Sequence, residues 1–99
     1  MIVIGKTREI YKDPNLPTIK SLISKEPIGN KKKILEYLRN GRITAAAAGT
    51  ANDIITGKTI DEPFCMFTDG VYAWRSDTIY YVDKYNLKLE DEFINHVLN

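Results

Sequence analysis

Two apolar runs joined by an Asp-Gly pair, FCMFTDGVYAW at residues 64–74, constrain this chain more than any other stretch. Apolar residues on both sides of Asp69 and Gly70 predict a β-hairpin, because Asp-Gly suits the backbone of a tight two-residue turn. Such a turn places Phe67 opposite Tyr72 in the paired strands. Both faces of the hairpin are apolar, so either the helices cover it on two sides, which we expect, or one face is kept for a partner.

Helical spacing of apolar residues recurs in four other stretches. The second has the clearest boundaries, with Asn30 as the predicted N-cap and Gly41 as the terminator. Proline breaks the first stretch before residue 27, and Ser76 or Asp77 is suited to cap the third. The four predicted helices lie within residues 17–26, 30–41, 76–86 and 87–99.

The run ITAAAAG, with its alanines at Ala45–Ala48, is compatible with either a helix or a strand. Alanine favours a helix, whereas the short length and the flanking glycines favour a strand. We take the strand as the prediction. Together with a short strand at Met1–Ile4, these elements predict an α+β fold, a small antiparallel sheet with a β-hairpin packed by about four helices.

The chain is expected to form one domain spanning residues 1–99, because its length and its 43% hydrophobic and 27% charged residues are ordinary for a single domain. Cys65 is the only cysteine, so no disulfide can form within the chain. The first residues, MIVIGKTREI, contain too few consecutive apolar residues for a signal peptide. We therefore expect a cytoplasmic protein.

Charge divides the chain into two unequal halves. Residues 1–42 contain ten Lys or Arg and four acids, a balance of +6, whereas residues 43–99 contain four and nine, a balance of −5. Such a distribution can steer a charged partner, and the acidic half contains the aromatic-rich stretch.

No residue pattern predicts catalysis, a metal or a cofactor. The triplet at Gly57–Thr59 lacks the earlier glycine of a phosphate-binding loop, since position 52 is asparagine. His96 lies near the chain end, on the expected polar side of the last helix, and Cys65 has no histidine near it in sequence. We interpret His96 as solvated and Cys65 as a buried, inert thiol, and we expect no enzymatic activity.

On a helical wheel of SDTIYYVDKYN, Ile79, Val82 and Tyr85 share the face expected to be buried. Tyr80 is then directed outward, with Tyr81 at the border. An exposed tyrosine among carboxylates suits contact with a protein surface rich in arginine and lysine.

The order of these pieces, from EYLRNG through DIITGKTI to FTDGVYAWRSDTIYYVDKYNLKLEDEFINHVL, resembles small immunity proteins of bacterial polymorphic toxin and contact-dependent growth inhibition systems. The likeness covers roughly residues 34–98. Its most recognisable parts are TDG at residues 68–70, Trp74, the Ser76-Asp77 pair, Tyr81, Tyr85 and the Glu92-Phe93-Ile94 pattern. This resemblance implies a non-enzymatic inhibitor that binds the C-terminal domain of a cognate toxin, frequently a nuclease, and blocks its active site.

Two hypotheses for function follow. The first is the immunity protein, docking onto a basic nuclease domain through the acidic surface of residues 61–85, with these contact residues: Asp61, Glu62, Asp77, Tyr80 and Asp83. The alternative is a small nucleic-acid-binding module, since basic residues recur along the helix of residues 31–42 and attract phosphate. Its binding residues would be Lys31, Lys32, Lys33, Arg39 and Arg42.

Overall fold

The computed structural model describes all residues, 1–99, and shows an α+β fold in which one sheet is covered by helices. The elements are β1 (Ile2–Val3), α1 (Arg8–Tyr11), α2 (Ile19–Leu22), α3 (Lys31–Arg39), β2 (Arg42–Asn52), β3 (Thr59–Thr68), β4 (Tyr72–Arg75), α4 (Ser76–Tyr85) and α5 (Asp91–Leu98).

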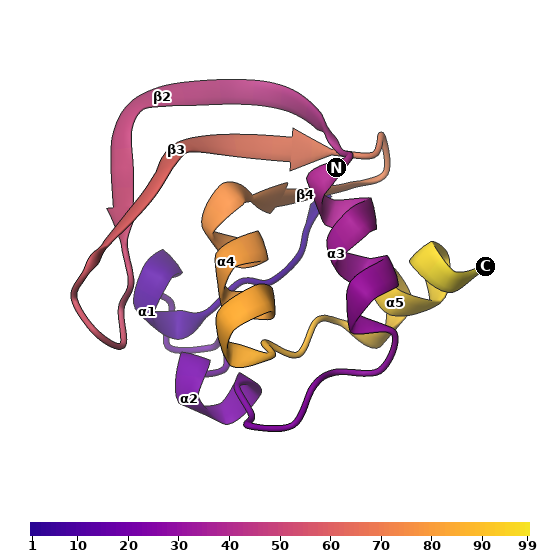
Figure 1. Cartoon of the computed structure of the whole chain (residues 1–99), viewed down its shortest axis with the longest axis horizontal. Coiled ribbons are helices and arrows are strands. Elements are labelled where there is room, and N and C mark those ends of the chain that lie inside the picture. Colours follow the sequence, from indigo (N-terminus) through magenta and orange to yellow (C-terminus); the bar gives the residue numbers. More distant parts are fainter.

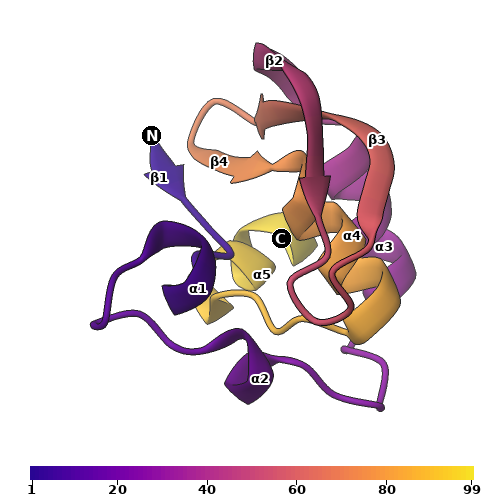
Figure 2. The same cartoon turned by 90° about the vertical axis from the view of Figure 1, so that its left-hand side faces the viewer.

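The sheet has the strand order β1-β4-β3-β2. Strands β2, β3 and β4 are antiparallel neighbours, but β1 pairs with β4 in parallel, so the sheet is mixed, not purely antiparallel as predicted. Strands β2 and β3 arch over α4, and the helices lie beneath this arch (Figure 1). In the side view β2, an edge strand of the sheet, is at the top, α1 lies below β1, and α2 is at the opposite end of the molecule (Figure 2).

The alanine run does form a strand. Ala45 pairs with Met66 and Ala46 with Cys65 in β3, so pairing with a neighbouring strand outweighs the helical preference of alanine. The fifth helix, α1, was not predicted, because four residues are too few to show a helical period.

The predicted hairpin between β3 and β4 is present, but its register differs from the prediction by two residues. Phe67 pairs with Trp74, not with Tyr72, and the loop is accordingly longer than a two-residue turn. The cause lies in Asp69, whose Oδ1 accepts the backbone N–H groups of Val71 at 2.9 Å and Tyr72 at 2.7 Å. An aspartate that bonds the backbone two residues ahead forms a turn of its own, and this one displaces the expected tight turn.

Trp74 is at the centre of the core and is 0% exposed. Its ring lies 5.6 Å from that of Phe93 and 6.2 Å from that of Tyr37, measured between centroids, and its Nε1 donates to the backbone oxygen of Leu38 at 3.1 Å. A Cβ on Gly41 would lie 2.7 Å from the indole, so a side chain there would collide with Trp74. Gly41 therefore serves the packing of Trp74, while α3 itself ends at Arg39.

Candidate functional site

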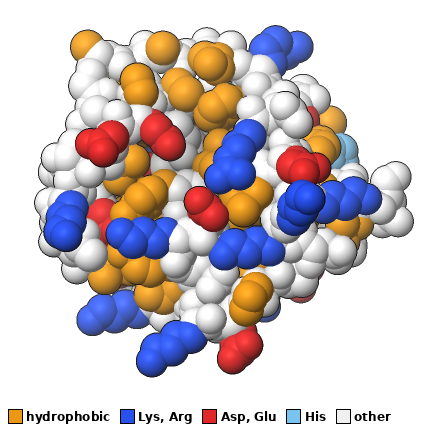
Figure 3. Space-filling view, in the orientation of Figure 1, with side chains coloured by type: hydrophobic (Ala, Val, Ile, Leu, Met, Phe, Trp, Pro, Cys, Tyr) orange, Lys and Arg blue, Asp and Glu red, His pale blue; other side chains and the backbone are white.

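A groove of about 300 Å³ lies between β3 and α4, below the arch of the sheet. Alternate residues of β3, from Pro63 to Phe67, form its wall together with the adjacent Glu62, and α4 contributes one face. Cys65 is half-buried at this wall, so the prediction of a buried thiol is wrong. In the space-filling view, hydrophobic side chains gather beneath the β2–β3 arch with acidic and basic side chains around them (Figure 3). The lining residues are Arg39, Glu62, Pro63, Cys65, Phe67, Ser76, Ile79, Tyr80 and Asp83.

Three of the five predicted contact residues, Glu62, Tyr80 and Asp83, line this groove. Asp61 is exposed on β3 beside Glu62, although it does not line the groove. The fold therefore brings Glu62 and Asp83, which are 21 positions apart along the chain, to the same groove.

Asp77 does not fit the predicted role. Its side chain is 4% exposed, and its two carboxylate oxygens accept hydrogen bonds from the guanidinium of Arg75 at 2.8 and 2.9 Å. A buried carboxylate held by two parallel bonds has little freedom to meet a partner. We therefore withdraw Asp77 as a contact residue.

The rim of the groove has three charged side chains. The guanidinium of Arg39 lies 3.4 Å from the carboxylate of Asp83, and both side chains are more than half exposed, at 54% and 57%. Glu62 is exposed and has no cation within 4.0 Å. The rim thus has two carboxylates and one guanidinium, which leaves one negative charge in excess.

Tyr80 is half-buried instead of fully outward, because its hydroxyl donates to Asp53 Oδ2 at 2.6 Å. The hydroxyl of Tyr85 donates to the same oxygen at 2.6 Å. Asp53 Oδ1 accepts the backbone N–H groups of Ile55 at 2.7 Å and Thr56 at 3.1 Å. These bonds join the turn between β2 and β3 to helix α4, so one side chain both lines the groove and anchors the arch.

Asp53 is 0% exposed, and this burial alone would raise its pKa. The hydrogen bonds from Tyr80, Tyr85, Thr56 and Ile55 outweigh that effect and hold the pKa at about 2. The same bond to the carboxylate, followed by burial, raises the pKa of the Tyr85 phenol. Lys84 completes the network, because its ammonium donates to the Tyr80 hydroxyl at 3.0 Å and lies 4.0 Å from Asp53 Oδ2.

Tyr81 is buried at 1% exposure, not at the border as predicted. Its hydroxyl oxygen accepts the backbone N–H of Ile54 at 3.0 Å, so it also holds the β2–β3 turn. Sequence reasoning missed this group of contacts. Two signals were available: an aspartate beginning a turn, and the tyrosines at positions 81 and 85, which are four residues apart on one helical face.

His96 is bonded, contrary to the prediction that it is merely solvated. Its Nε2 lies 2.9 Å from Asp69 Oδ2, which also accepts the hydroxyl hydrogen of Tyr37 at 2.5 Å. Burial would raise the pKa of Asp69, but hydrogen bonds from Tyr37, the backbone and His96 lower it to about 2. This cluster joins α3, the β3–β4 turn and α5.

The lysines at the start of α3 divide into two kinds. Lys31 donates to the backbone oxygen of Asp83 at 2.8 Å and to the side-chain oxygen of Asn86 at 2.6 Å, at the C-terminal end of α4. A cation stabilises the negative end of a helix dipole, so Lys31 has a structural role. Lys32 and Lys33 are exposed. Asn30 precedes this helix as predicted, but its backbone is left-handed and its side chain makes no capping bond.

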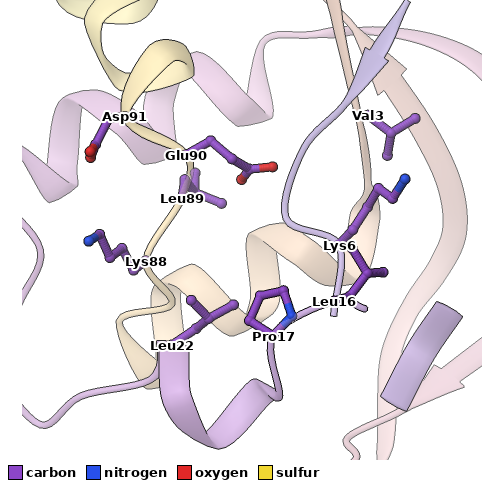
Figure 4. Close-up of a pocket in the computed structure, with 9 residues that line it drawn as sticks. All are labelled: Val3, Lys6, Leu16, Pro17, Leu22, Lys88, Leu89, Glu90 and Asp91. Carbon is purple, nitrogen blue, oxygen red and sulfur yellow. The ribbon is translucent and has the colours of Figure 1, made fainter. Parts of the chain in front are cut away.

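A larger cavity of about 500 Å³ lies between the N-terminal segment and the link from α4 to α5. Lys6 and Lys88 lie on opposite sides of it (Figure 4), and Glu90 accepts the backbone N–H of Gly5 at 3.0 Å. None of the predicted contact residues is among its lining residues, which are Val3, Lys6, Leu16, Pro17, Leu22, Lys88, Leu89, Glu90 and Asp91. The groove between β3 and α4 is therefore the candidate site.

Nowhere in the structure do three or more His, Cys, Asp or Glu side chains come together in a way that could hold a metal ion. None of the five helices has the length and apolar character needed to cross a membrane. No protein-family model, curated protein or solved structure matches the chain.

Proposed function

We propose that this chain is a cytoplasmic immunity protein that binds and blocks the C-terminal toxin domain, a nuclease, of a contact-dependent growth inhibition system. The observation that supports it most is the groove between β3 and α4, where Glu62, Tyr80 and Asp83 meet over apolar walls. The resemblance of residues 34–98 to such proteins supplies the class of partner.

The groove has the composition of a protein interface. Protein interfaces combine a dry apolar centre rich in aromatic side chains with a polar rim, and tyrosine is frequent among the residues that dominate binding. Here Phe67, Ile79 and Tyr80 supply the centre, while Glu62 and Asp83 supply the rim. A nuclease surface that binds phosphate is basic, so these carboxylates match it and accelerate association.

The groove alone is too small for a stable complex. A standard interface buries about 800 Å² on each partner. Asp61 and the exposed face of β2 adjoin the groove through β3, so we assign the remaining contact area to them.

The direct test is co-expression with the C-terminal domain of a toxin encoded immediately upstream of the gene for this chain. The proposal predicts restored growth and a complex that purifies intact. Continued growth arrest with the folded, soluble chain present would contradict it.

Glu62→Lys tests the assigned surface. Glu62 is exposed and lacks an ion-pair partner, so we expect the substitution to leave the fold unchanged. Reversing a rim charge should weaken toxin binding by about tenfold, mainly through slower association. Glu92→Lys on α5, also exposed and outside the groove, is the matched control and should leave the affinity unchanged. Equal affinities of the two variants would show that another surface binds the toxin.

The alternative is a nucleic-acid-binding module on α3. Fewer basic side chains of residues 31–42 are free to bind phosphate than the sequence indicates. Lys31 and Arg39 make polar contacts within the chain, although Arg39 remains exposed, which leaves Lys32, Lys33 and Arg42 as the cations without such contacts. Salt-sensitive binding of RNA or DNA that disappears in the double variant Lys32→Ala and Lys33→Ala would favour this alternative over the inhibitor.

A further inference from the structure

The groove already holds a guanidinium, and it comes from the chain itself. Arg39 ends α3, and its side chain reaches across to Asp83 on α4 with a separation of 3.4 Å between Nη2 and Oδ2. The other carboxylate of the rim, Glu62, has no partner. Of the two carboxylates that could receive a partner's cation, Asp83 is therefore already paired with an internal cation, and Glu62 is free.

The contact between Arg39 and Asp83 is of the kind that releases easily. A single bond of 3.4 Å is long, and both side chains are more than half exposed to water. Exposed ion pairs change an equilibrium by about fivefold at most. Arg75 and Asp77 show the contrast, because two bonds of 2.8 and 2.9 Å join them and Asp77 is buried.

The walls of the groove suit the rest of an arginine side chain. Pro63 and Phe67 on β3 face Ile79 and Tyr80 on α4, so a methylene stem finds apolar contact while the guanidinium reaches the rim. Aromatic rings attract a guanidinium, and planar guanidinium groups pair with carboxylates through two parallel bonds. Lysine offers no such planar match.

We propose that the toxin inserts an arginine side chain into this groove, where it pairs with Glu62 and displaces Arg39 from Asp83. Arg39 is then an internal competitor that occupies the site in the free protein. This inference rests on the proposed function for the source of the arginine, and it assigns the chemical group that the groove recognises.

A small probe tests the recognition without any toxin. The ¹⁵N-labelled full chain is titrated with N-acetyl-arginine methylamide and followed by amide chemical shifts. We expect saturable shifts at Phe67, Ile79 and Tyr80 with a dissociation constant on the order of 1–10 mM, as is usual for so small a ligand. The matched probe is N-acetyl-citrulline methylamide, which has nearly the same shape without the charge. Equal binding of the two probes, or shifts located elsewhere, would overturn the proposal.

Three variants test whether Arg39 competes with the arginine ligand or helps to bind it. Arg39→Gln should tighten binding of the arginine probe by about two- to fivefold, because it removes both the competing guanidinium and its repulsion. Glu62→Gln and Asp83→Asn should each weaken binding by a similar factor. Weaker binding by Arg39→Gln would show that Arg39 helps to hold the ligand and would overturn its assignment as a competitor.

The outcomes distinguish the inference from the function on which it rests. Rescue of growth by a chain that does not bind the probe would keep the immunity function and remove the arginine groove. Specific probe binding by a chain that fails to rescue growth would keep the groove and remove the toxin as its partner.

Discussion

The body of this protein, formed by the helices with β1 and β4, and its outer hairpin of β2 and β3 are stabilised in different ways. In the body, large apolar side chains such as Trp74 and Phe93 are fully buried and contact each other. In the hairpin formed by β2 and β3, nearly every side chain of β2 is exposed, and the turn at its end is fixed by hydrogen bonds to Asp53 and Tyr81. The body depends on the hydrophobic effect, and β3 shares in it because Phe67 stacks on Trp74. Strand β2 and the β2–β3 turn depend instead on pairing with β3 and on a few polar contacts.

The groove lies where the two regions meet, and Tyr80 belongs to both. Its ring lines the groove, and its hydroxyl bonds Asp53 in the hairpin. The shape of the groove therefore depends on the less strongly packed region. Changes that affect one region and leave the other intact are the sharpest tests of this difference.

The largest effect is expected from Trp74→Ala in the body. Loss of the buried indole and of its contacts should lower the free energy of unfolding by about 3–5 kcal/mol, measured by chemical denaturation. Trp74→Phe, which keeps a ring, should lower it less. A cost under about 1 kcal/mol for Trp74→Ala would contradict the central role of this side chain.

Acid should destabilise both regions through two aspartates. The pKa values of Asp53 and Asp69 in the folded protein, about 2, are below the ordinary value of 3.8, so each carboxylate stabilises the fold at neutral pH. That stabilisation, about 2 kcal/mol for each group, should be lost progressively as the pH falls from about 5 to 2. The free energy of unfolding, measured by chemical denaturation at several pH values, gives the sum of the two contributions.

Asp53→Asn shows how much of this loss of stability in acid comes from the hairpin. Asparagine keeps the size but lacks the charge, so the variant should be less stable at neutral pH and should lose less stability on acidification. Amide hydrogen exchange should accelerate at Ile55 and Thr56 more than at Trp74, because opening of the hairpin need not unfold the body. Equal acceleration at both places would show that the two regions unfold as one unit.

The smallest effect is expected from Tyr85→Phe, which removes one of the two phenols bonded to Asp53. Losing one hydrogen bond should lower the free energy of unfolding by about 1 kcal/mol. The raised pKa of Tyr85 means that its stabilising contribution persists up to about pH 10 and disappears at higher pH. Absorbance of phenolate should therefore show one fewer late-titrating tyrosine in the variant. The control Tyr11→Phe removes a hydroxyl from an exposed tyrosine and should change stability little.

The elements of this fold with regular spacing or strong turn chemistry could be predicted from the sequence. The helix of residues 31–39, the last two helices and the hairpin around Asp69 and Gly70 all have such signals. The hairpin register could not be predicted, because it depends on whether the Asp69 side chain bonds the backbone ahead of it. The parallel pairing of β1 with β4 joins distant segments, which periodicity does not encode.

Part of the candidate site was also predictable. Glu62, Tyr80 and Asp83 stood out because acidic and aromatic residues are concentrated in one stretch, and they share one groove. Spacing alone could not predict which carboxylates are free and which are ion-paired. Asp77 pairs with Arg75, and Asp83 pairs with Arg39 from another helix. The acidic surface is consequently smaller than the balance of −5 over residues 43–99 indicates.

The exposure of β2 also bears on how this protein can evolve. Residues 43–52 contain no charged side chain and no proline, and replacing most of them removes almost no buried surface. The strand is thus a place where mutations can accumulate and new specificities arise while the body continues to fold. Selection on its sequence would come from whatever touches it, and hardly at all from the rest of the molecule.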